Sequence, residues 1–269
     1  MSTVVLQTLE TTPQRELVPL RWYAPRNVVR FLLPVAALAA WQTGSATGLI
    51  QSQTLPSPTE VARTFVELFD TGDLQAAMPA SLARAGAGLF LGLLIGIGFG
   101  LINGLSRFAE EIFDSTFQIV RLVPFIALVP LFIIWFGIGE EPKIILITLA
   151  CVFPAYLNTY AGVRNVDSRL VEAARTFGLS PLQITFQVLL PAALPSVLVG
   201  VRYSMGISLL ALIVAEQTNS RAGIGYLIFV ASGAMRIDMV VACVLIYAAL
   251  GIAIDLVMRL IEKSALPWR

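Results

Sequence analysis

The chain has 269 residues, of which 57% are hydrophobic and 13% are charged, and its formal net charge is +1. A soluble domain carries about twice that charged fraction, so the apolar excess indicates that a lipid bilayer surrounds much of the chain. The small net charge gives no reason to expect nucleic acid as a partner, and the lack of histidine excludes histidine bases and Ser-His-Asp triads.

No motif for a cofactor or a metal is found in the sequence. Cys151 and Cys243 both fall inside apolar runs, where a free thiol behaves as a small hydrophobic side chain. Lys143 and Lys263 both lack the glycine-rich loop that holds ATP in a P-loop. We therefore expect no catalytic residue, no cofactor and no metal in this chain.

Six apolar runs follow a polar N-terminal tail. The tail, residues 1–27, lacks the small-residue cleavage site of a removed signal peptide, so we expect a cytoplasmic tail followed by one membrane domain over 28–269. Each run is close to the ~20 residues that cross a bilayer, where only helices satisfy their own backbone. The predicted fold is all-α, with transmembrane helices at 29–49, 82–105, 115–137, 144–162, 195–216 and 238–258.

The segment between the first two runs predicts a short amphipathic helix. Ser57-Pro58-Thr59-Glu60 is a capping box, and Val61, Phe65 and Leu68 follow on one helical face. We expect this helix to lie at the outer membrane surface, either packed on the bundle or in contact with a partner.

Glycine recurs at every fourth position of the second run, at 88, 92, 96, 100 and 104. Small residues at this spacing let another helix backbone approach closely. The stripe could mark a subunit interface, but we favour packing within the chain.

Five ionisable residues lie in or near the runs: Asp114, Arg121, Arg202, Glu216 and Asp255. Such residues are expensive in lipid and usually face an interior or a water-filled path. Interfacial solvation accounts for Asp114 and Asp255, while Glu216 is placed where it could line a gate. Arg121 and Arg202 are placed either to snorkel to the surface or to contact an anion.

Prolines interrupt the third and fourth runs. Pro124 and Pro130 lie in the third run and Pro154 in the fourth, and each removes one intrahelical hydrogen bond. Broken helices line substrate routes in some transporters and are plain kinks in other bundles. The candidates for a translocation pathway are Arg121, Pro124, Arg202 and Glu216.

The loop over about 163–194 predicts two capped helices joined by a tight turn. Asp167 or Ser168 caps a helix that contains Glu172-Ala173-Ala174, and Gly178 closes it in the left-handed conformation. Ser180-Pro181-Leu182-Gln183 is a second capping box, whose helix continues through Pro191 into the fifth run. A rigid elbow of this kind can transmit force from a partner to the membrane helices.

The distribution of Lys and Arg orients the chain. With the N-terminus in the cytoplasm, the inner side holds most of them, and the elbow and both termini are then cytoplasmic. The inner set is Arg15, Arg21, Arg26, Arg30, Arg107, Arg164, Arg169, Arg175, Arg259, Lys263 and Arg269. The smaller outer set is Arg63, Arg84, Lys143, Arg221 and Arg236.

The elbow resembles the EAA signature of ABC importer permeases, in which E-A-A and a glycine precede an aliphatic residue and Leu-Pro at fixed spacing. The matching positions are Glu172, Ala173, Ala174, Gly178, Val188 (for the commoner isoleucine), Leu190 and Pro191. Three more stretches resemble the nitrate/sulfonate/taurine/bicarbonate branch: residues 55–58, 135–139 and 161–164. The tail from Gly223 to the end is most similar to the aliphatic sulfonate permeases.

This resemblance implies a type I importer permease in the plasma (inner) membrane, with the first EAA helix docked on an ATP-binding subunit. It implies a second permease copy, two ATP-binding subunits that hold ATP and Mg, and a periplasmic or lipid-anchored substrate-binding protein. The expected cargo is a small oxyanion, most readily an alkanesulfonate or taurine. The alternatives are nitrate, bicarbonate or a thiamine-precursor pyrimidine in the same machinery, and an ion-coupled carrier or channel that acts alone.

Overall fold

A computed structural model describes residues 26–267, and every regular element in that range is a helix. The predicted tail over 1–27 falls outside the described residues except for its last two. The helices are α1 (Arg26–Ala46), α2 (Pro58–Asp70), α3 (Asp73–Leu105), α4 (Arg107–Val120), η1 (Phe125–Leu128), α5 (Val129–Phe136), α6 (Glu141–Arg164), α7 (Ser168–Thr176), α8 (Pro181–Ile184), η2 (Thr185–Leu189), α9 (Leu190–Asn219), α10 (Ile224–Gly233) and α11 (Ile237–Ala265).

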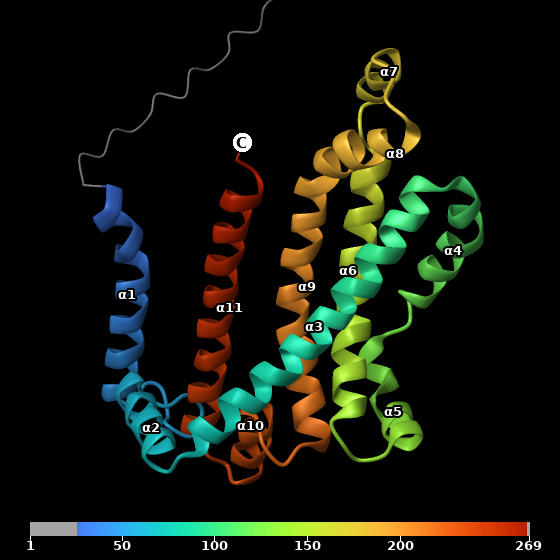
Figure 1. The fold of residues 1–269 in the computed structure, drawn as a ribbon. Coiled ribbons are helices and arrows are strands. Elements are labelled where there is room, and N and C mark those ends of the chain that lie inside the picture. The colour runs from blue at the N-terminus through green and yellow to red at the C-terminus, as the bar shows by residue number, and fades with distance from the viewer. Residues whose placement is uncertain (1–25, 268–269) are drawn as a thin grey trace, which may run out of the picture.

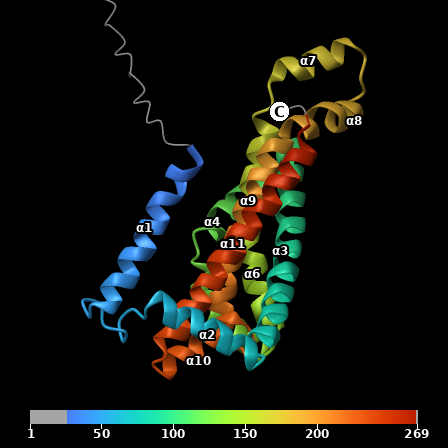
Figure 2. The ribbon, with the colours of Figure 1, turned by 90° about the vertical axis from the view of Figure 1, so that its left-hand side faces the viewer.

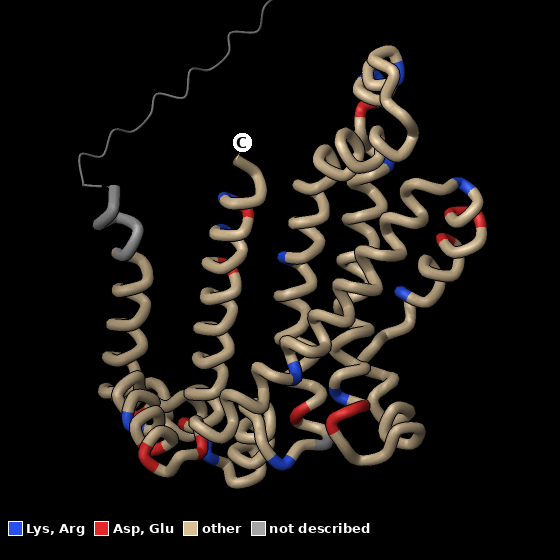
Figure 3. Tube along the Cα trace, viewed as in Figure 1, with Lys and Arg blue, Asp and Glu red and all other residues tan. Residues whose placement is uncertain are grey.

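The long helices run between two ends of the molecule (Figure 1). One, the α7 end, carries α7, α8, the turn between α3 and α4, and the end of α11. The other, the α2 end, carries α2, α5 and α10. Helices α3, α6 and α9 pack together as the core, whereas α1 packs against α2 and stands apart from the bundle in both views (Figures 1 and 2). Charged residues gather toward the two ends, as expected for a chain that crosses a membrane (Figure 3).

Within residues 26–267, four helical stretches are long and apolar enough to cross a bilayer: Asp73–Leu105, Glu141–Arg164, Pro181–Thr218 and Ile237–Ala265. They include the second, fourth, fifth and sixth predicted runs. Helix α3 begins at Asp73 rather than at 82, and α6 continues through Pro154 without a break. The first predicted run corresponds to α1, which is not among these four.

The third predicted run is not one straight helix. Its two halves, Arg107–Val120 and Phe125–Phe136, are bent by 81° and together could form a fifth span. Pro124, in extended backbone, caps η1, and Pro130 lies in the first turn of α5, where its missing N–H costs nothing. The run is therefore broken at Pro124 rather than kinked, and Pro130 lies within the second helical segment.

The glycine stripe packs α3 against α6, which confirms the internal packing favoured from the sequence. A methyl group at Gly96 would lie 2.5 Å from the carbonyl oxygen of Val152, and one at Gly92 would lie 2.5 Å from Cβ of Cys151. Neither position has room for a side chain, so the two backbones are in direct contact along this seam.

Helix α2 begins with the predicted capping box, in which Ser57 Oγ accepts from Glu60 N–H and Glu60 accepts from Ser57 N–H. Val61 and Leu68 are buried against the bundle, and Thr64 donates to Asp238 at the start of α11. The predicted amphipathic helix therefore packs on the chain itself.

Candidate coupling elbow and membrane polar sites

The elbow between α6 and α9 has the predicted geometry. Asp167 accepts a hydrogen bond from Arg169 N–H, and Ser180 and Gln183 form the second capping box. Gly178 has φ +79°, and the N–H groups of Gly178 and Leu179 donate to the carbonyls of Arg175 and Ala174, which closes α7. The turn needs a residue that adopts positive φ at little cost, and glycine supplies it.

The elbow presents a mixed apolar and charged face beyond the bundle. Phe177 is 84% exposed, Leu182 and Leu170 are also exposed, and Ala174 is buried toward the chain. Glu172 is exposed, and no ion pair engages its carboxylate within residues 26–267. Figures 1 and 2 both place α7 at the extreme of its end of the molecule, as a docking element requires.

The elbow is continuous with the membrane core. Helix α8 passes through the single π-helical turn η2 into α9, so Val188, Leu190 and Pro191 lie on one helical path with the membrane span. A displacement of α8 would therefore be transmitted along α9, and α7 is joined to α8 by the short turn over residues 177–180.

The four pathway candidates do not converge on one site. Arg121 ends α4 beside the 81° break, and Pro124 caps η1 beyond it; both are exposed. Arg202 projects from α9 toward α11, where it pairs with Glu262 at 3.2 Å and Asp255 at 3.6 Å. No hydrogen bond or ion pair in the described part of the chain joins Arg121, Arg202 and Glu216 to one another, and their part in transport stays a prediction.

Glu216 is the most completely enclosed of the four candidates. It is 0% exposed and accepts from Arg84 Nη1 at 2.7 Å, from Ser81 Oγ at 2.8 Å and from the N–H of Gly225 at 2.8 Å. Gly223 and Gly225 allow the backbone to pass this carboxylate, since a methyl group at Gly223 would lie 2.3 Å from Glu216 Oε1.

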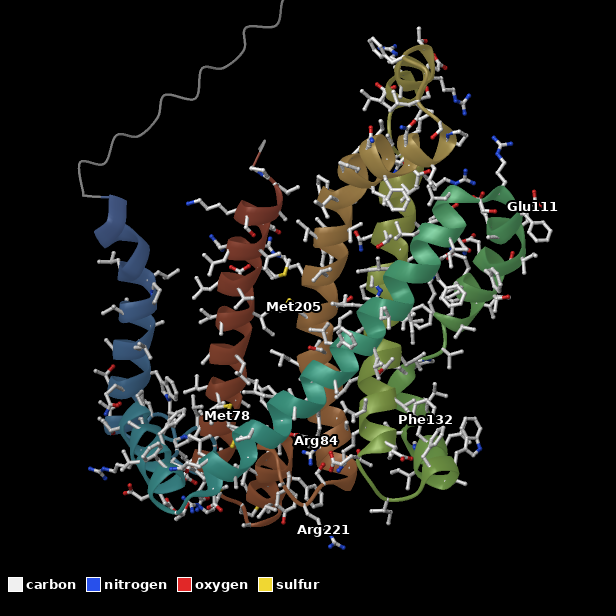
Figure 4. The ribbon with its side chains drawn as sticks, viewed as in Figure 1. Met78, Arg84, Glu111, Phe132, Met205 and Arg221 are labelled. Atoms are coloured by element: carbon white, nitrogen blue, oxygen red, sulfur yellow. The ribbon has the colours of Figure 1, made fainter. Side chains whose placement is uncertain are left out.

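Arg84 extends this buried group to the turn between α5 and α6. Its guanidinium also donates to Glu140 at 2.5 Å and to the carbonyl of Ala222 at 2.6 Å, and Lys143 donates to Glu140 at 2.9 Å. These two ion pairs lower the pKa of Glu140, which lies just outside α6, to about 2. We call Ser81, Arg84, Glu140, Lys143 and Glu216 the Glu216 cluster; Figure 4 labels Arg84 within it.

Sequence reasoning missed most of this cluster. It counted Arg84 and Lys143 among the outer-side charges, but both lie inside helices and are 6% and 5% exposed. Ser81 and Glu140 received no role. The one available signal was that Arg84 lies inside the second predicted run and Lys143 adjoins the fourth, where a charge must find a partner.

A second polar group ties the bent α4 to the core. Tyr156 Oη donates to Asp114 at 3.0 Å and accepts from Asn103 at 2.9 Å, while Glu110 pairs with Arg164 and accepts from Tyr160. Asp114 is therefore bonded to a core tyrosine rather than only solvated at the interface. Asn103 thereby joins α3 to α6.

The helices, the broken span and the enclosed charges define a multi-pass membrane protein with a helical elbow at one end. The profile of the family "Binding-protein-dependent transport system inner membrane component" matches residues 88–266. The chain is 43% identical over 242 residues to the putative aliphatic sulfonates transport permease protein SsuC of Escherichia coli (strain K12), covering 90% of this chain and 92% of that protein. It is 33% identical over 254 residues to the taurine transport system permease protein TauC of the same strain, covering 92% of each.

Among solved structures, the inward-facing MetNI methionine ABC transporter matches with a TM-score of 0.55 and 20% identity, over 66% of this chain and 91% of that one. This likeness shows that the chain has the fold of a type I ABC importer permease. The chain belongs to the family of binding-protein-dependent transport system inner membrane components.

The chain is therefore the transmembrane permease subunit of an importer in the inner membrane, and it is not an enzyme. Membership of this family implies ATP-binding subunits and a substrate-binding protein as partners. It also decides against the alternative of an ion-coupled carrier that acts alone.

Proposed function

We propose that this permease imports small oxyanions, with alkanesulfonates or taurine as the cargo, and that α7 is the helix through which ATP-binding subunits drive it. The similarity to permeases named for aliphatic sulfonates and for taurine supports the cargo. The observation that carries the coupling role is the doubly capped, exposed elbow that runs into α9 without a loop.

The complete assembly has two copies of this chain, two ATP-binding subunits and an external binding protein. The α7 end faces the cytoplasm, and the N- and C-termini lie on the same side. No cofactor binds this chain, and ATP and Mg are held by the partner. Seven residues form the docking element: Glu172, Ala173, Ala174, Gly178, Val188, Leu190 and Pro191. Exposed Glu172 offers an acceptor to partner cations, and Phe177 offers apolar surface to a groove.

Replacing Gly178 tests the coupling role. Valine at φ +79° is strained by roughly 1–2 kcal/mol and disturbs the turn that fixes α7 against α8. We expect Gly178→Val to insert in the membrane normally but to lose substrate-stimulated ATPase activity and uptake in proteoliposomes that contain the full importer.

Gly48→Val is the matched control. Gly48 has φ +74° and, like Gly178, has no atom within 4 Å of an added methyl group, but it follows α1 at the α2 end. The control should keep its ATPase coupling. Normal coupling in Gly178→Val, or equal loss in both variants, would count against α7 as the transmitting element.

The cargo is tested separately, with the purified importer and its binding protein. Uptake of labelled ethanesulfonate and taurine is compared with uptake of nitrate, bicarbonate and a thiamine-precursor pyrimidine. Import of one of these three without sulfonate import would replace the proposed cargo and leave the coupling role intact.

A further inference from the structure

A cavity opens at the α2 end beside the Glu216 cluster. Its volume is about 710 Å³, and its polar lining consists of Arg84, Glu140 and Lys143 of the Glu216 cluster, Gln217 and Thr218 of α9, and Ser220 and Arg221 of the following loop. In Figure 4, the side chain of Arg221 extends beyond the ribbon at this end, on the same side of the molecule as Arg84. The cavity is thus on the face that the proposed orientation directs away from the cytoplasm.

Two polar groups of the lining have unused hydrogen-bonding capacity. Lys143 is 5% exposed, and within residues 26–267 its ammonium donates only to Glu140, although it has three N–H donors. The buried hydroxyl oxygen of Ser220 has no hydrogen-bond partner among the described residues. Buried polar groups are normally paired, so these two indicate a place for a polar ligand.

Hydrogen bonds to α3 and α9 fix the loop that carries Ser220 and Arg221. Arg84 donates to the carbonyl of Ala222, and the N–H groups of Ile224 and Gly225 donate to Ser81 and Glu216. These bonds fix the backbone just after Arg221 to α3 and α9. A ligand at this loop would meet donors whose backbone is already ordered, which reduces the entropy lost on binding.

The charges favour a single negative charge in the cavity. Arg84 and Lys143 are balanced by Glu140 and Glu216, with which they form ion pairs. Arg221 is exposed and forms no ion pair in the described part of the chain, so its charge is not neutralised. A guanidinium with a nearby ammonium and hydroxyl suits an anion with several equivalent oxygens.

We propose that this cavity is an entry subsite for a soluble monovalent oxyanion of the sulfonate class, held by Arg221, Lys143 and Ser220 before it crosses the membrane. The proposal rests on the cargo class of the proposed function. The phosphate of a lipid headgroup has the same chemistry and is the competing occupant, so the experiment separates the two.

The test measures binding of radiolabelled ethanesulfonate to the complete importer in nanodiscs, without binding protein. Discs of phosphatidylcholine alone are compared with discs that contain phosphatidylglycerol. We expect Arg221→Ala to weaken binding about tenfold and Ser220→Ala to weaken it by less, because the first removes a charge-assisted bond and the second a neutral one. Arg221→Lys should restore most of the affinity.

Arg63→Ala is the control, because Arg63 lies on α2 and lines a different cavity at the same end. Ethanesulfonate binding unchanged by Arg221→Ala and Ser220→Ala overturns the subsite. So does an effect of Arg221→Ala confined to phosphatidylglycerol discs, which assigns the arginine to lipid.

Uptake in proteoliposomes with binding protein distinguishes this failure from failure of the proposed function. Wild-type import of ethanesulfonate together with unaltered binding in the variants overturns the subsite alone. Absence of wild-type sulfonate import overturns the cargo, whereas the nanodisc measurement still decides whether the cavity binds the anion.

Discussion

Each half of the membrane bundle contains a group of ion-paired side chains, and the two groups differ sharply in how far they are exposed. At the α2 end, Glu216 is completely buried, and Arg84 beside it is 6% exposed. Toward the α7 end, the side chains of Arg202, Asp255 and Glu262 remain 40%, 45% and 30% exposed. Glu216 and Arg84 are enclosed by helices and backbone donors, although Glu140 at the edge of their cluster is 54% exposed, and the second group is open to its surroundings.

This difference shows that the free-energy cost of removing one partner of an ion pair depends on how deeply the pair is buried. A half-exposed pair exchanges water for a partner at little net gain, about 0–1 kcal/mol. A buried pair adds little when both partners are present, but removing one partner leaves a charge without water or counter-ion. We therefore expect the Glu216 cluster to hold one fixed arrangement, and the Arg202 group to rearrange readily as α9 and α11 move.

The largest effect should come from truncating one carboxylate in each group. Glu216→Ala removes the acceptor of Ser81 and Gly225 and the buried one of the two carboxylates that pair with Arg84, and should destabilise the chain by roughly 3–5 kcal/mol. Asp255→Ala should cost about 0–1 kcal/mol, because Glu262 still pairs with Arg202. Denaturant titration of the purified chain in micelles measures both. Equal losses would remove the contrast between the two groups.

Introducing a larger side chain into the contact between α3 and α6 should have an intermediate effect on stability. A side chain at Gly96 meets the backbone of α6, so Gly96→Val should destabilise the chain by roughly 1–3 kcal/mol. Gly98 lies two positions along the same helix and has open space at its Cβ, so Gly98→Val is the control. The same micelle titration serves here, and matching curves for the two variants would refute close contact of α3 with α6.

The smallest effect concerns the acid sensitivity of the Glu216 cluster at the α2 end. Arg84 and Lys143 lower the pKa of Glu140 from 4.5 to about 2. A carboxyl group whose pKa is lower in the folded than in the unfolded chain stabilises the folded state at pH values above the unfolded-state pKa. This contribution is lost as the pH falls from about 4.5 toward 2. Glu140→Gln should remove this part of the acid sensitivity, as read from unfolding midpoints between pH 3 and pH 7. A wild-type slope in the variant would contradict the assignment.

Local sequence signals predicted the elements that depend on neighbouring residues. The caps at Ser57, Asp167 and Ser180 and the left-handed turn at Gly178 are each set within a few residues, and all four occur in the structure. The glycine stripe likewise predicted a close helix contact, although the sequence did not indicate that α6 is the partner.

Long-range pairing escaped the sequence. Arg84 and Glu216 are 132 positions apart, and no periodicity links them, so the sequence alone groups Arg84 with the other outer-side charges. The sequence also predicted an interruption in the third run, but not that the helix axis bends by 81° after Val120. Pro124 permits a break there, but α4 is held by packing on α3 and by side-chain bonds to α6, and α5 packs on α6; these contacts form only in the folded chain. The roles of Arg121 and Arg202 in transport stay predictions.

The direct backbone contact between α3 and α6 also limits where a solute can travel. Where carbonyl oxygens of one helix touch the glycines of the other, the space is too narrow for a water molecule, let alone an anion with its oxygens. A conduit through this permease must therefore run along surfaces that this pair turns outward. The pair itself therefore offers no route, and in the proposed assembly the far wall of the channel would come from a second copy of the chain.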